Sequence, residues 1–478
     1  MLAISRPSPK RRIHILPNGS ESLRRNEPDH ASPLQERTLI DPQVITAGKA
    51  VNSVVQGSYV DMQSDFYVSP VFLFDRCIDD RHLIDGLRGA LTRVPVFGGR
   101  LRARGDALEI VCCDAGVPMT VVDVEATLAD AMREVTNPDS FLIDWVVDST
   151  PVEQRPLLTV RVSRLADGGM ALGLSWNHVV GDMASFMQFM RVWSALVEGE
   201  TAPEILIVED REGYLDRFLW REEKTQITCP LLSEEDLRQE NPDAPTHDNS
   251  VVQIYFGENE VGRMRQSLSR AVSRQLSSND VLCAHLLTTL WNMEAESEPW
   301  WLAIVVDLRH RLGMPTEVIG NFSQIAAFQC SAVGQSDVVA AQIRSVLEKY
   351  TQIYHCRCVD RAITNVGRSR SHRCVFWPSR EARGLGIIAW TRMGIYDITF
   401  GGQHPSFFSQ NFDYRSLRRP WGGVYSEGPG GVGFLFTLRL PARVIEKLRS
   451  PQGRKMIHRF GDTGDVRRTP ADLAQHII

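Results

Sequence analysis

The sequence predicts a two-domain protein built from both strands and helices. Its 478 residues are too many for one ordinary hydrophobic core and favour two domains of roughly 200 residues each. Short apolar runs typical of buried strands alternate with segments whose apolar side chains recur at helical spacing. Residues 206–248 instead mix prolines with charges of both signs, which is typical of a crossover linker. We therefore predict domains at 39–205 and 249–478, joined by this linker.

The composition favours a soluble protein of a reducing compartment. Apolar residues make up 43% and charged residues 23% of the chain, and the formal net charge is −5, without the dense Lys/Arg stripe that favours nucleic-acid binding. No run approaches the roughly 18 apolar residues of a membrane span. The 9 cysteines are irregularly placed and lack zinc-binding spacing. We expect a cytoplasmic monomer without a metal, a nucleic-acid partner or a membrane span.

Residues 1–38 differ from the rest of the chain. They are rich in Ser, Pro, Arg, Asn and Glu and contain few large apolar side chains, a composition typical of disorder. Their arginines are consistent with a transit peptide, but the acidic residues among them and the lack of an apolar core argue against a targeting segment. We predict a disordered N-terminal tail.

The segment from Met170 to Leu196 carries the strongest functional signal. Its first residues form an apolar run typical of a buried strand, and the apolar residues after Asp182 recur at helical spacing. His178 stands where the strand ends, before a turn that contains Gly181. Because the strand fixes the backbone and the turn lets the imidazole face a cavity, His178 is a candidate general base. Two structural alternatives are a histidine packed in the core and an Asp182 that only caps the helix.

The other elements are predicted from apolar periodicity and from turn residues. Strands are predicted at 68–74, 108–113, 156–162, 169–176, 251–256 and 301–312, and helices at 79–92, 214–220, 258–270, from 277 onward and at 441–450. The strands at 156–162 and 169–176 form a hairpin that leads to His178. The glycines of 428–433 are predicted as a hairpin turn, because they lack the Lys-Ser/Thr of a phosphate loop and precede a strand. His285 is predicted to be a packed helix residue.

Motifs in three parts of the chain, in matching order, resemble the BAHD-type acyl-CoA-dependent acyltransferases of plants and fungi. More broadly they resemble the superfamily of chloramphenicol acetyltransferase and the condensation domains. The motifs are His178-x-x-x-Asp182, then Asp307-x-Arg309-x-Arg311 with Gly320-Asn321, and finally the signature stretch Trp390–Pro405. The signature loop keeps Phe400, Gly401 and Pro405 but has Thr399 and Gly402 where the family has Asp and Trp.

The resemblance implies an α/β fold of two chloramphenicol acetyltransferase-like domains. Each would be a mixed β-sheet flanked by helices, with a channel between the domains. Acyl-CoA, by default acetyl-CoA, would be the co-substrate, and the acceptor would be a hydroxyl of a secondary metabolite. His178 would act as general base in a direct transfer, without an acyl-enzyme and without a bound cofactor. Arg309 would pair with Asp182 to orient the loop, with Asp307 as further support.

Alternatives to each part of this interpretation stay open. Arg309 in a surface charge cluster is one alternative to the pair with Asp182. Acylation of an amine, or use of a carrier-bound thioester as in condensation domains, is an alternative reaction, although condensation domains have a second histidine where this chain has Asn177. A non-catalytic binding protein on the same scaffold is a third reading. Asn177, next to the base, is also a candidate for contact with the oxyanion or the substrate.

Overall fold

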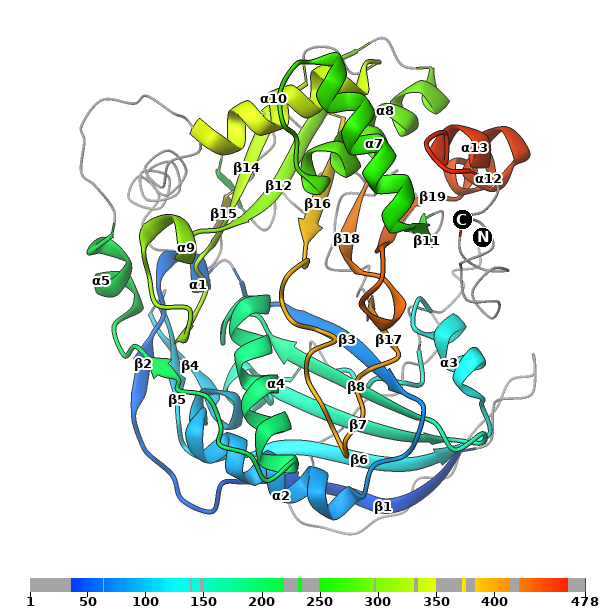
Figure 1. Cartoon of the computed structure of the whole chain (residues 1–478). Helices are drawn as coiled ribbons and strands as arrows, with labels where there is room; N and C mark the ends of the chain where they lie inside the picture. Colours follow the sequence, from blue (N-terminus) through cyan, green and yellow to red (C-terminus); the bar gives the residue numbers. More distant parts are fainter. Residues whose placement is uncertain are drawn as a thin grey trace, which may run out of the picture.

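The computed structural model describes most of the chain (Figure 1). The described residues are 36–62, 64–105, 107–137, 140–146, 150–218, 231–233, 249–295, 298–330, 334–349, 372–374, 383–411, 421–462 and 478. The predicted N-terminal tail lies outside them except for residues 36–38, which belong to strand β1 (Glu36–Ile45). Much of the predicted linker also lies outside the described residues.

The first domain is built on a six-stranded mixed sheet. The strand order is β1, β6 (Val117–Val124), β7 (Leu158–Leu165), β8 (Met170–Asn177), β3 (Tyr67–Phe74) and β17 (Phe407–Asn411). β6 and β7 run parallel, and the other neighbours are antiparallel. β7 and β8 form the predicted hairpin. Helices α2 (Asp80–Arg93) and α4 (Met183–Val197) share one apolar core with this sheet.

Strand β3 is buried on both faces, which explains its continuous apolar run. Phe72 and Phe74 belong to the core beneath α2 and α4. Val71 and Leu73 point to the opposite face, as the alternation of a strand requires, and belong to a second core. Helix α3 (Leu128–Glu134) and the segment 140–146 supply much of that second core. The sheet is therefore a central layer with cover on both sides.

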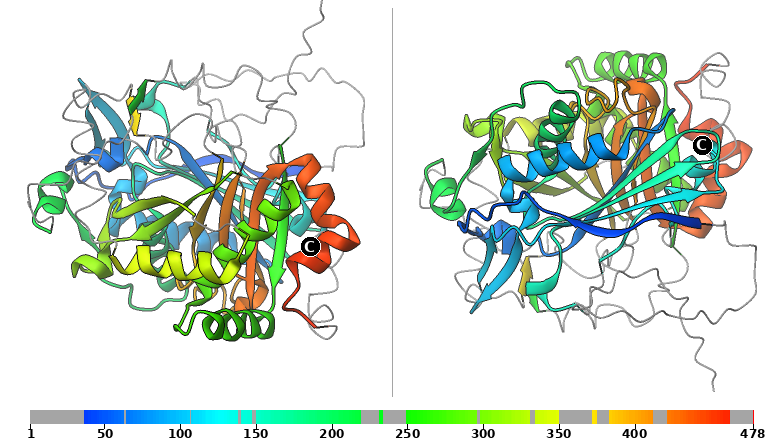
Figure 2. Two further views of the ribbon diagram at one scale, coloured as in Figure 1. Left: turned by 90° about the horizontal axis from the view of Figure 1, so that it is seen from above. Right: turned by 90° about the horizontal axis from the view of Figure 1, so that it is seen from below.

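The second domain repeats the architecture with its own six-stranded mixed sheet. Its order is β11 (Asn249–Phe256), β19 (Phe434–Pro441), β18 (Gly422–Glu427), β16 (Gly384–Ala389), β12 (Trp301–Asp307) and β14 (Ser323–Gln329). The flanking helices are α7 (Glu258–Ala271), α8 (Ser278–Glu294), α10 (Ser336–Lys349), α12 (Ala442–Arg449) and α13 (Pro451–Ile457). Ser277 and Asp280 form the capping box that begins α8. Figures 1 and 2 show α12 and α13 at one end of the molecule, beside the C-terminus.

Strand β17 crosses from the second half of the chain into the first sheet. It pairs antiparallel with β3, with Phe407 opposite Leu73 and Asn411 opposite Ser69. The sequence-based division assigned residues 249–478 to the second domain. The structure instead places β17 in the sheet of the first domain. Nothing in the apolar pattern of 407–411 reports which sheet it joins, because that choice depends on tertiary packing.

Short elements connect the two domains. The linker forms β9 (Leu206–Ile207) and α5 (Arg211–Asp216), and β9 pairs in parallel with β13 (Val318–Ile319). The predicted linker helix at 214–220 therefore begins and ends earlier than expected.

A small sheet in the first domain contains β2 (Val54–Gln56), β5 (Ala107–Val111) and β4 (Arg100–Arg104), and β10 (Leu231–Ser233) pairs with β15 (His372–Cys374). The remaining short helices are α1 (Tyr59–Met62), α9 (Arg309–Leu312), and the 3-10 turns Pro95–Gly98, Val152–Gln154 and Pro429–Gly431.

Several sequence predictions hold, and the predicted end of one strand is wrong. The Gly-rich stretch is a turn between β18 and β19, and α12 is the predicted closing helix. The strand predicted at 301–312 stops at Asp307, and its charged end forms α9 instead. Gly313 terminates α9 by adopting the left-handed region, with φ of +67°. Within the described residues, no helix combines the length and apolar character needed to cross a membrane.

Candidate active site

Residues 178–182, here called the histidine loop, join β8 to α4. The indole of Trp176 donates to the carbonyl of Gly181 at 3.0 Å and closes the turn. A Cβ at Gly181 would lie 2.5 Å from the Cβ of Ser185, so only glycine fits there. Asp182 is the N-cap of α4, and its side chain accepts from the Ser185 amide at 3.1 Å. The capping alternative is thus correct, but it is only part of what Asp182 does.

His178 is a partly exposed residue, and its imidazole lies against aromatic rings. Its centroid is 4.8 Å from that of Phe66 and 6.5 Å from that of Trp176. Nδ1 is buried and has no hydrogen-bond partner outside its own residue within the described chain. Burial lowers the pKa of His178 below its ordinary value, and the carboxylates of Asp182 and Asp61 oppose this shift without reversing it. The lowered pKa favours the neutral imidazole at neutral pH.

His285 shows what a packed histidine looks like in this fold. It is fully buried inside α8, and its Nε2 donates to the carbonyl of Ile457 at 2.6 Å. Burial lowers its pKa to about 3. The prediction of a packed helix residue is confirmed, and the partial exposure of His178 sets it apart.

Asp182 is bound by Arg309 in the bidentate arrangement that the sequence predicted. Nη1 and Nη2 of Arg309 donate to Oδ2 and Oδ1 of Asp182, each at 2.9 Å. The amide of Phe322 and the hydroxyl of Ser323 also donate to Oδ2, each at 3.0 Å. Burial raises the pKa of Asp182, but the charge and hydrogen bonds of Arg309 outweigh it and bring the pKa to about 2. These bonds point the carboxylate toward the second domain and not toward the imidazole.

Arg309 is a buried connecting residue and not part of a surface charge cluster. Its side chain is 2% exposed, whereas Arg311 is exposed. Nη1 also donates to Asp307 Oδ1 at 3.1 Å, and Nη2 donates to the carbonyl of Gly320 at 3.0 Å and to the hydroxyl of Ser185 at 2.9 Å. The surface-cluster alternative is therefore wrong for Arg309. Asp307 lies beside the guanidinium, as the sequence predicted.

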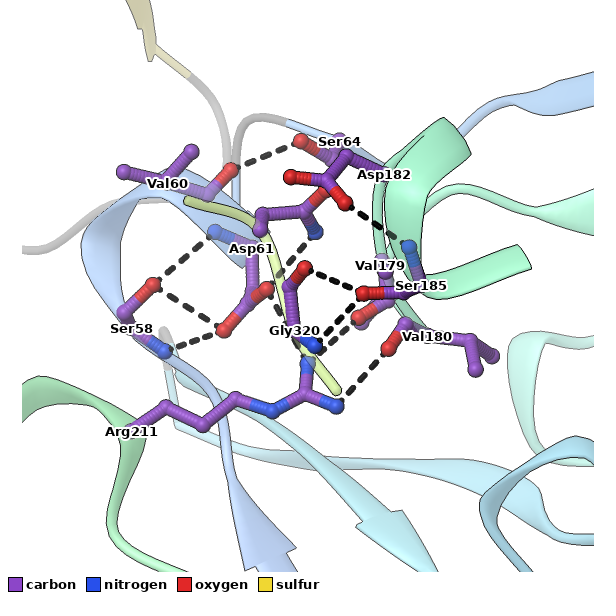
Figure 3. Close-up of polar contacts among 12 residues, drawn as sticks. Ser58, Val60, Asp61, Ser64, Val179, Val180, Asp182, Ser185, Arg211 and Gly320 are labelled. Atoms are coloured by element: carbon purple, nitrogen blue, oxygen red, sulfur yellow. Dashed lines mark hydrogen bonds and ion pairs between the residues drawn. The ribbon is translucent and has the colours of Figure 1, made fainter. Parts of the chain in front are cut away.

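A second set of contacts, which the sequence reasoning missed, holds the carbonyl groups of the histidine loop (Figure 3). Arg211, from α5 in the linker, donates to the carbonyls of Val179 at 2.8 Å and Val180 at 2.7 Å. Asn321, from the second domain, donates to the carbonyl of His178 at 2.7 Å. The Gly-Asn motif pointed to Asn321 without giving it a role. Arg211 stands among other charged linker residues, and no spacing distinguishes it.

Asn177 is committed to the backbone of the loop. It is fully buried, its Nδ2 donates to Asp65 at 2.8 Å, and its Oδ1 accepts from the Val179 amide at 3.0 Å. These bonds fix the start of the turn. Contact with an oxyanion or a substrate stays a prediction for this residue.

The signature loop packs on α4 at the end away from His178. Phe400 lies edge-on to Phe74 and Trp193, with ring centroids 5.9 and 5.3 Å away. Gly401 and Gly402 have φ of +62° and +69°, which glycine adopts without strain. The Gly402 amide donates to Glu198 at 3.1 Å, and Pro405 is buried. This placement indicates a structural role for the loop.

Among the described residues, the site brings no cluster of metal ligands to His178. No cluster of three or more His, Cys, Asp or Glu residues that could bind an ion occurs in the described part of the chain. The buried Cys283 and Cys330 belong to the core of the second domain. Burial raises the pKa of both thiols, which disfavours the reactive thiolate.

Two mixed sheets, with a histidine loop of the first domain held by residues of the second, form a chloramphenicol acetyltransferase-like fold. A family model described as the Transferase family matches residues 38–418. Because this match covers well over half of the chain, the protein belongs to that family, the BAHD-type acyltransferases.

Relatives and solved structures agree with this assignment. Benzyl alcohol O-benzoyltransferase of Nicotiana tabacum is 30% identical over 236 residues, which are 47% of this chain and 50% of that protein, so the chain spans half the length of this relative. The crystal structure of vinorine synthase matches with a TM-score of 0.67 at 17% identity and covers 92% of this chain and 100% of its own. F. graminearum TRI101, complexed with coenzyme A and deoxynivalenol, matches with a TM-score of 0.68 at 15% identity, over 84% of this chain and 98% of its own. At these identities the two structures establish the fold alone.

Proposed function

We propose that this protein transfers an acyl group from acyl-CoA directly to a hydroxyl of a small secondary metabolite. Acetyl-CoA is the proposed donor. The observation that carries the proposal is the state of His178, a neutral and partly exposed imidazole on a loop that both domains hold. Membership of the acyltransferase family supports the reaction type. We further propose that the enzyme is a monomer of the cytoplasm.

In the proposed step, Nε2 of His178 takes the proton of the acceptor hydroxyl as its oxygen attacks the thioester carbonyl carbon. The new C–O bond forms, and the carbonyl becomes a tetrahedral oxyanion. This intermediate collapses with cleavage of the C–S bond, and the imidazolium returns its proton to the CoA thiolate. The products are an ester and free CoA, and His178 is regenerated neutral. A lowered histidine pKa supports this cycle because the base is unprotonated before substrate binds.

A direct transfer fits the side chains around the loop better than an acyl-enzyme. Ser175 precedes the histidine by three residues, but it is fully buried and its hydroxyl is paired with Ser69 at 3.0 Å. The hydroxyl of Ser185 is engaged with Gly320 and Arg309. None of these groups is bonded to His178, as an activated nucleophile would be.

The same experiment distinguishes three alternatives. An amine acceptor would use the same base, and only the product distinguishes it from an alcohol. A carrier-bound thioester is disfavoured because the position of the second histidine of condensation domains is the buried Asn177. A non-catalytic binding protein would bind CoA without releasing thiol from an acyl donor.

The test measures free thiol with purified protein, a panel of acyl-CoAs, and separate pools of alcohols and amines. We expect acceptor-dependent release that falls by about 100-fold or more in His178→Ala. His82→Ala, which removes an exposed histidine on α2, is the matched control and should keep full activity. Mass spectrometry of the product separates ester from amide.

Two outcomes would contradict the proposal. Release that survives in His178→Ala would remove the histidine from the role of general base. Binding of CoA without thiol release for any donor and acceptor would favour the binding-protein alternative. Size-exclusion chromatography with light scattering checks the monomer.

A further inference from the structure

The histidine loop is closed by internal hydrogen bonds and is held from outside at its carbonyls and at two amides. The amides of His178 and Asp182 donate to the carbonyls of Phe66 at 2.8 Å and Gly320 at 3.3 Å. Asn177 accepts from the amide of Val179 with Oδ1 and from the amide of Val180 with its carbonyl, each at 3.0 Å. The carbonyl of His178 accepts from the amide of Gly181 at 3.1 Å. The internal bonds fix the shape of the turn. The outside donors, Arg211 and Asn321, can then fix only where the turn lies relative to the domains.

One carboxylate orients both outside donors. Oδ1 of Asp61 accepts from Nη1 of Arg211 at 3.1 Å and from Nδ2 of Asn321 at 2.7 Å. Oδ2 accepts from the amide and the hydroxyl of Ser58, at 2.7 and 3.0 Å. The side chains of Asp61 and Arg211 are 0% and 1% exposed. Figure 3 shows Asp61 and Arg211 beside Val179 and Val180. Hydrogen bonds of buried charged groups are strong and favour one fixed arrangement, although Arg211 Nε and Asn321 Oδ1 have no hydrogen-bond partner within the described residues.

The three residues of this network come from three different segments. Asp61 is in α1 of the first domain, Arg211 begins α5 in the linker, and Asn321 follows β13 of the second domain. The linker is itself tied to both domains: β9 pairs with β13, and the carbonyl of Glu209 accepts from the amide of Gln56 at 2.7 Å. A shift of one domain relative to the other would therefore move these donors and, with them, the histidine loop.

We propose that Asp61, Arg211 and Asn321 are positioning residues for the proposed acyl transfer, on which this inference rests. They act through the backbone of His178. Because Asn321 holds the carbonyl of His178 itself, the direction of that peptide group determines where the imidazole points. Arg211 holds the carbonyls of Val179 and Val180 in place. Asp61 in turn holds the side chains of Arg211 and Asn321.

The test uses full-length variants that remove donors from the network. Asn321→Ala removes the bond to the His178 carbonyl, and Arg211→Lys keeps the charge but lacks the forked geometry that reaches two carbonyls. Asp61→Asn combined with Arg211→Gln removes both buried charges together, because the loss of one alone would leave the other unpaired. We expect kcat to fall by about 10- to 100-fold, with KM for acyl-CoA within about twofold of the wild type because no donor contact is removed.

A matched control separates positioning from a general loss of stability. Asp280, which is buried, and Arg344, which is 26% exposed, form another ion pair, which joins α8 to α10 in the second domain. The double variant Asp280→Asn, Arg344→Gln should lower the unfolding temperature while kcat stays within about twofold. Unfolding temperatures of all variants are measured beside their kinetics.

A spectroscopic measurement tests the inference without catalysis. In protein labelled with 13C at histidine Cε1, the His178 resonance is the one that His178→Ala removes. We expect this resonance to move in Asn321→Ala and in the Asp61, Arg211 double variant, and to stay in place in the Asp280, Arg344 control. If the wild type transfers no acyl group, the proposed function fails while this readout still decides the positioning. An unmoved resonance, or wild-type kcat in the network variants, would overturn the inference.

Discussion

Arg309 and Asp182 join two segments 127 residues apart through two parallel hydrogen bonds of 2.9 Å each. Asp182 is the N-cap of α4, and Arg309 lies two residues after Asp307, the last residue of β12. Because neither side chain is accessible to water, the pair is screened little by salt. It therefore fixes the start of α4, and with it the histidine loop, to the second domain.

Arg309 variants should separate charge from geometry. Arg309→Lys keeps a positive charge but loses the parallel bonds, whereas Arg309→Ala leaves Asp182 buried without its partner and should cost about 3–5 kcal/mol of unfolding free energy. We expect stability in the order wild type, Lys, Ala, and kcat lowered in both variants. Urea unfolding and thiol-release kinetics measure the two effects. An alanine variant as stable as the wild type would contradict the importance of the pair.

The pH dependence of kcat/KM should report the neutral imidazole of His178. The active form of the base is unprotonated, and burial lowers its pKa below the ordinary value of 6.5. Activity is therefore lost only as pH falls below that value, and the midpoint of the acid limb should lie under pH 6.5. An acid midpoint above 6.5 would mean that the nearby carboxylates dominate over burial. Enzyme incubated at each pH and assayed after return to pH 7.5 controls for unfolding.

Ser185 should support the site through its contacts with Gly320 and Arg309. Its hydroxyl donates to the carbonyl of Gly320 at 2.9 Å and accepts from the amide of Gly320 at 3.0 Å and from Arg309 at 2.9 Å. Ser185→Ala leaves these buried groups short of a partner and should cost about 1–3 kcal/mol, with a lower kcat. Denaturant unfolding and steady-state kinetics test this.

Ser194 provides the control for Ser185. It lies on the same helix and makes the same kind of double contact, donating to the carbonyl of Thr399 at 2.7 Å and accepting from its amide at 3.0 Å. Ser194→Ala should lose comparable stability and keep kcat, since the contact is to the signature loop. Equal losses of kcat in both variants would indicate that stability alone explains them.

The local part of the site was predictable from the sequence, and the tertiary part was not. The strand, turn and helix around His178 follow from apolar spacing, a glycine and a capping aspartate, which are local signals. The pair of Arg309 with Asp182 followed from the order of motifs that the family shares. Arg211 and Asp61 gave no signal, because one stands in a charged linker and the other in a four-residue helix. Their contact with each other and with Asn321 depends on how three distant segments pack.

The same limit applies to Gly173, which the sequence shows only as a glycine within an apolar strand. In the structure, a Cβ at this position would lie 1.8 Å from the carbonyl oxygen of Leu142. The segment 140–146 therefore passes directly over β8 at the one position without a side chain. A glycine in a strand interior commonly marks such a close approach of another backbone, but the partner segment cannot be inferred from the pattern.

Gly173→Ala should therefore displace the segment 140–146 and destabilise the first domain. The added Cβ would meet the backbone of Leu142, so the segment 140–146 must move to relieve the clash. We expect the free energy of unfolding to fall by about 1–3 kcal/mol or more. Gly386→Ala in β16 is the matched control, because nothing lies within 4 Å of its added Cβ. That control should be neutral or slightly stabilising, since alanine reduces the freedom of the unfolded chain. Urea unfolding compares the two variants, and equal stability would show that the segment over Gly173 yields without cost.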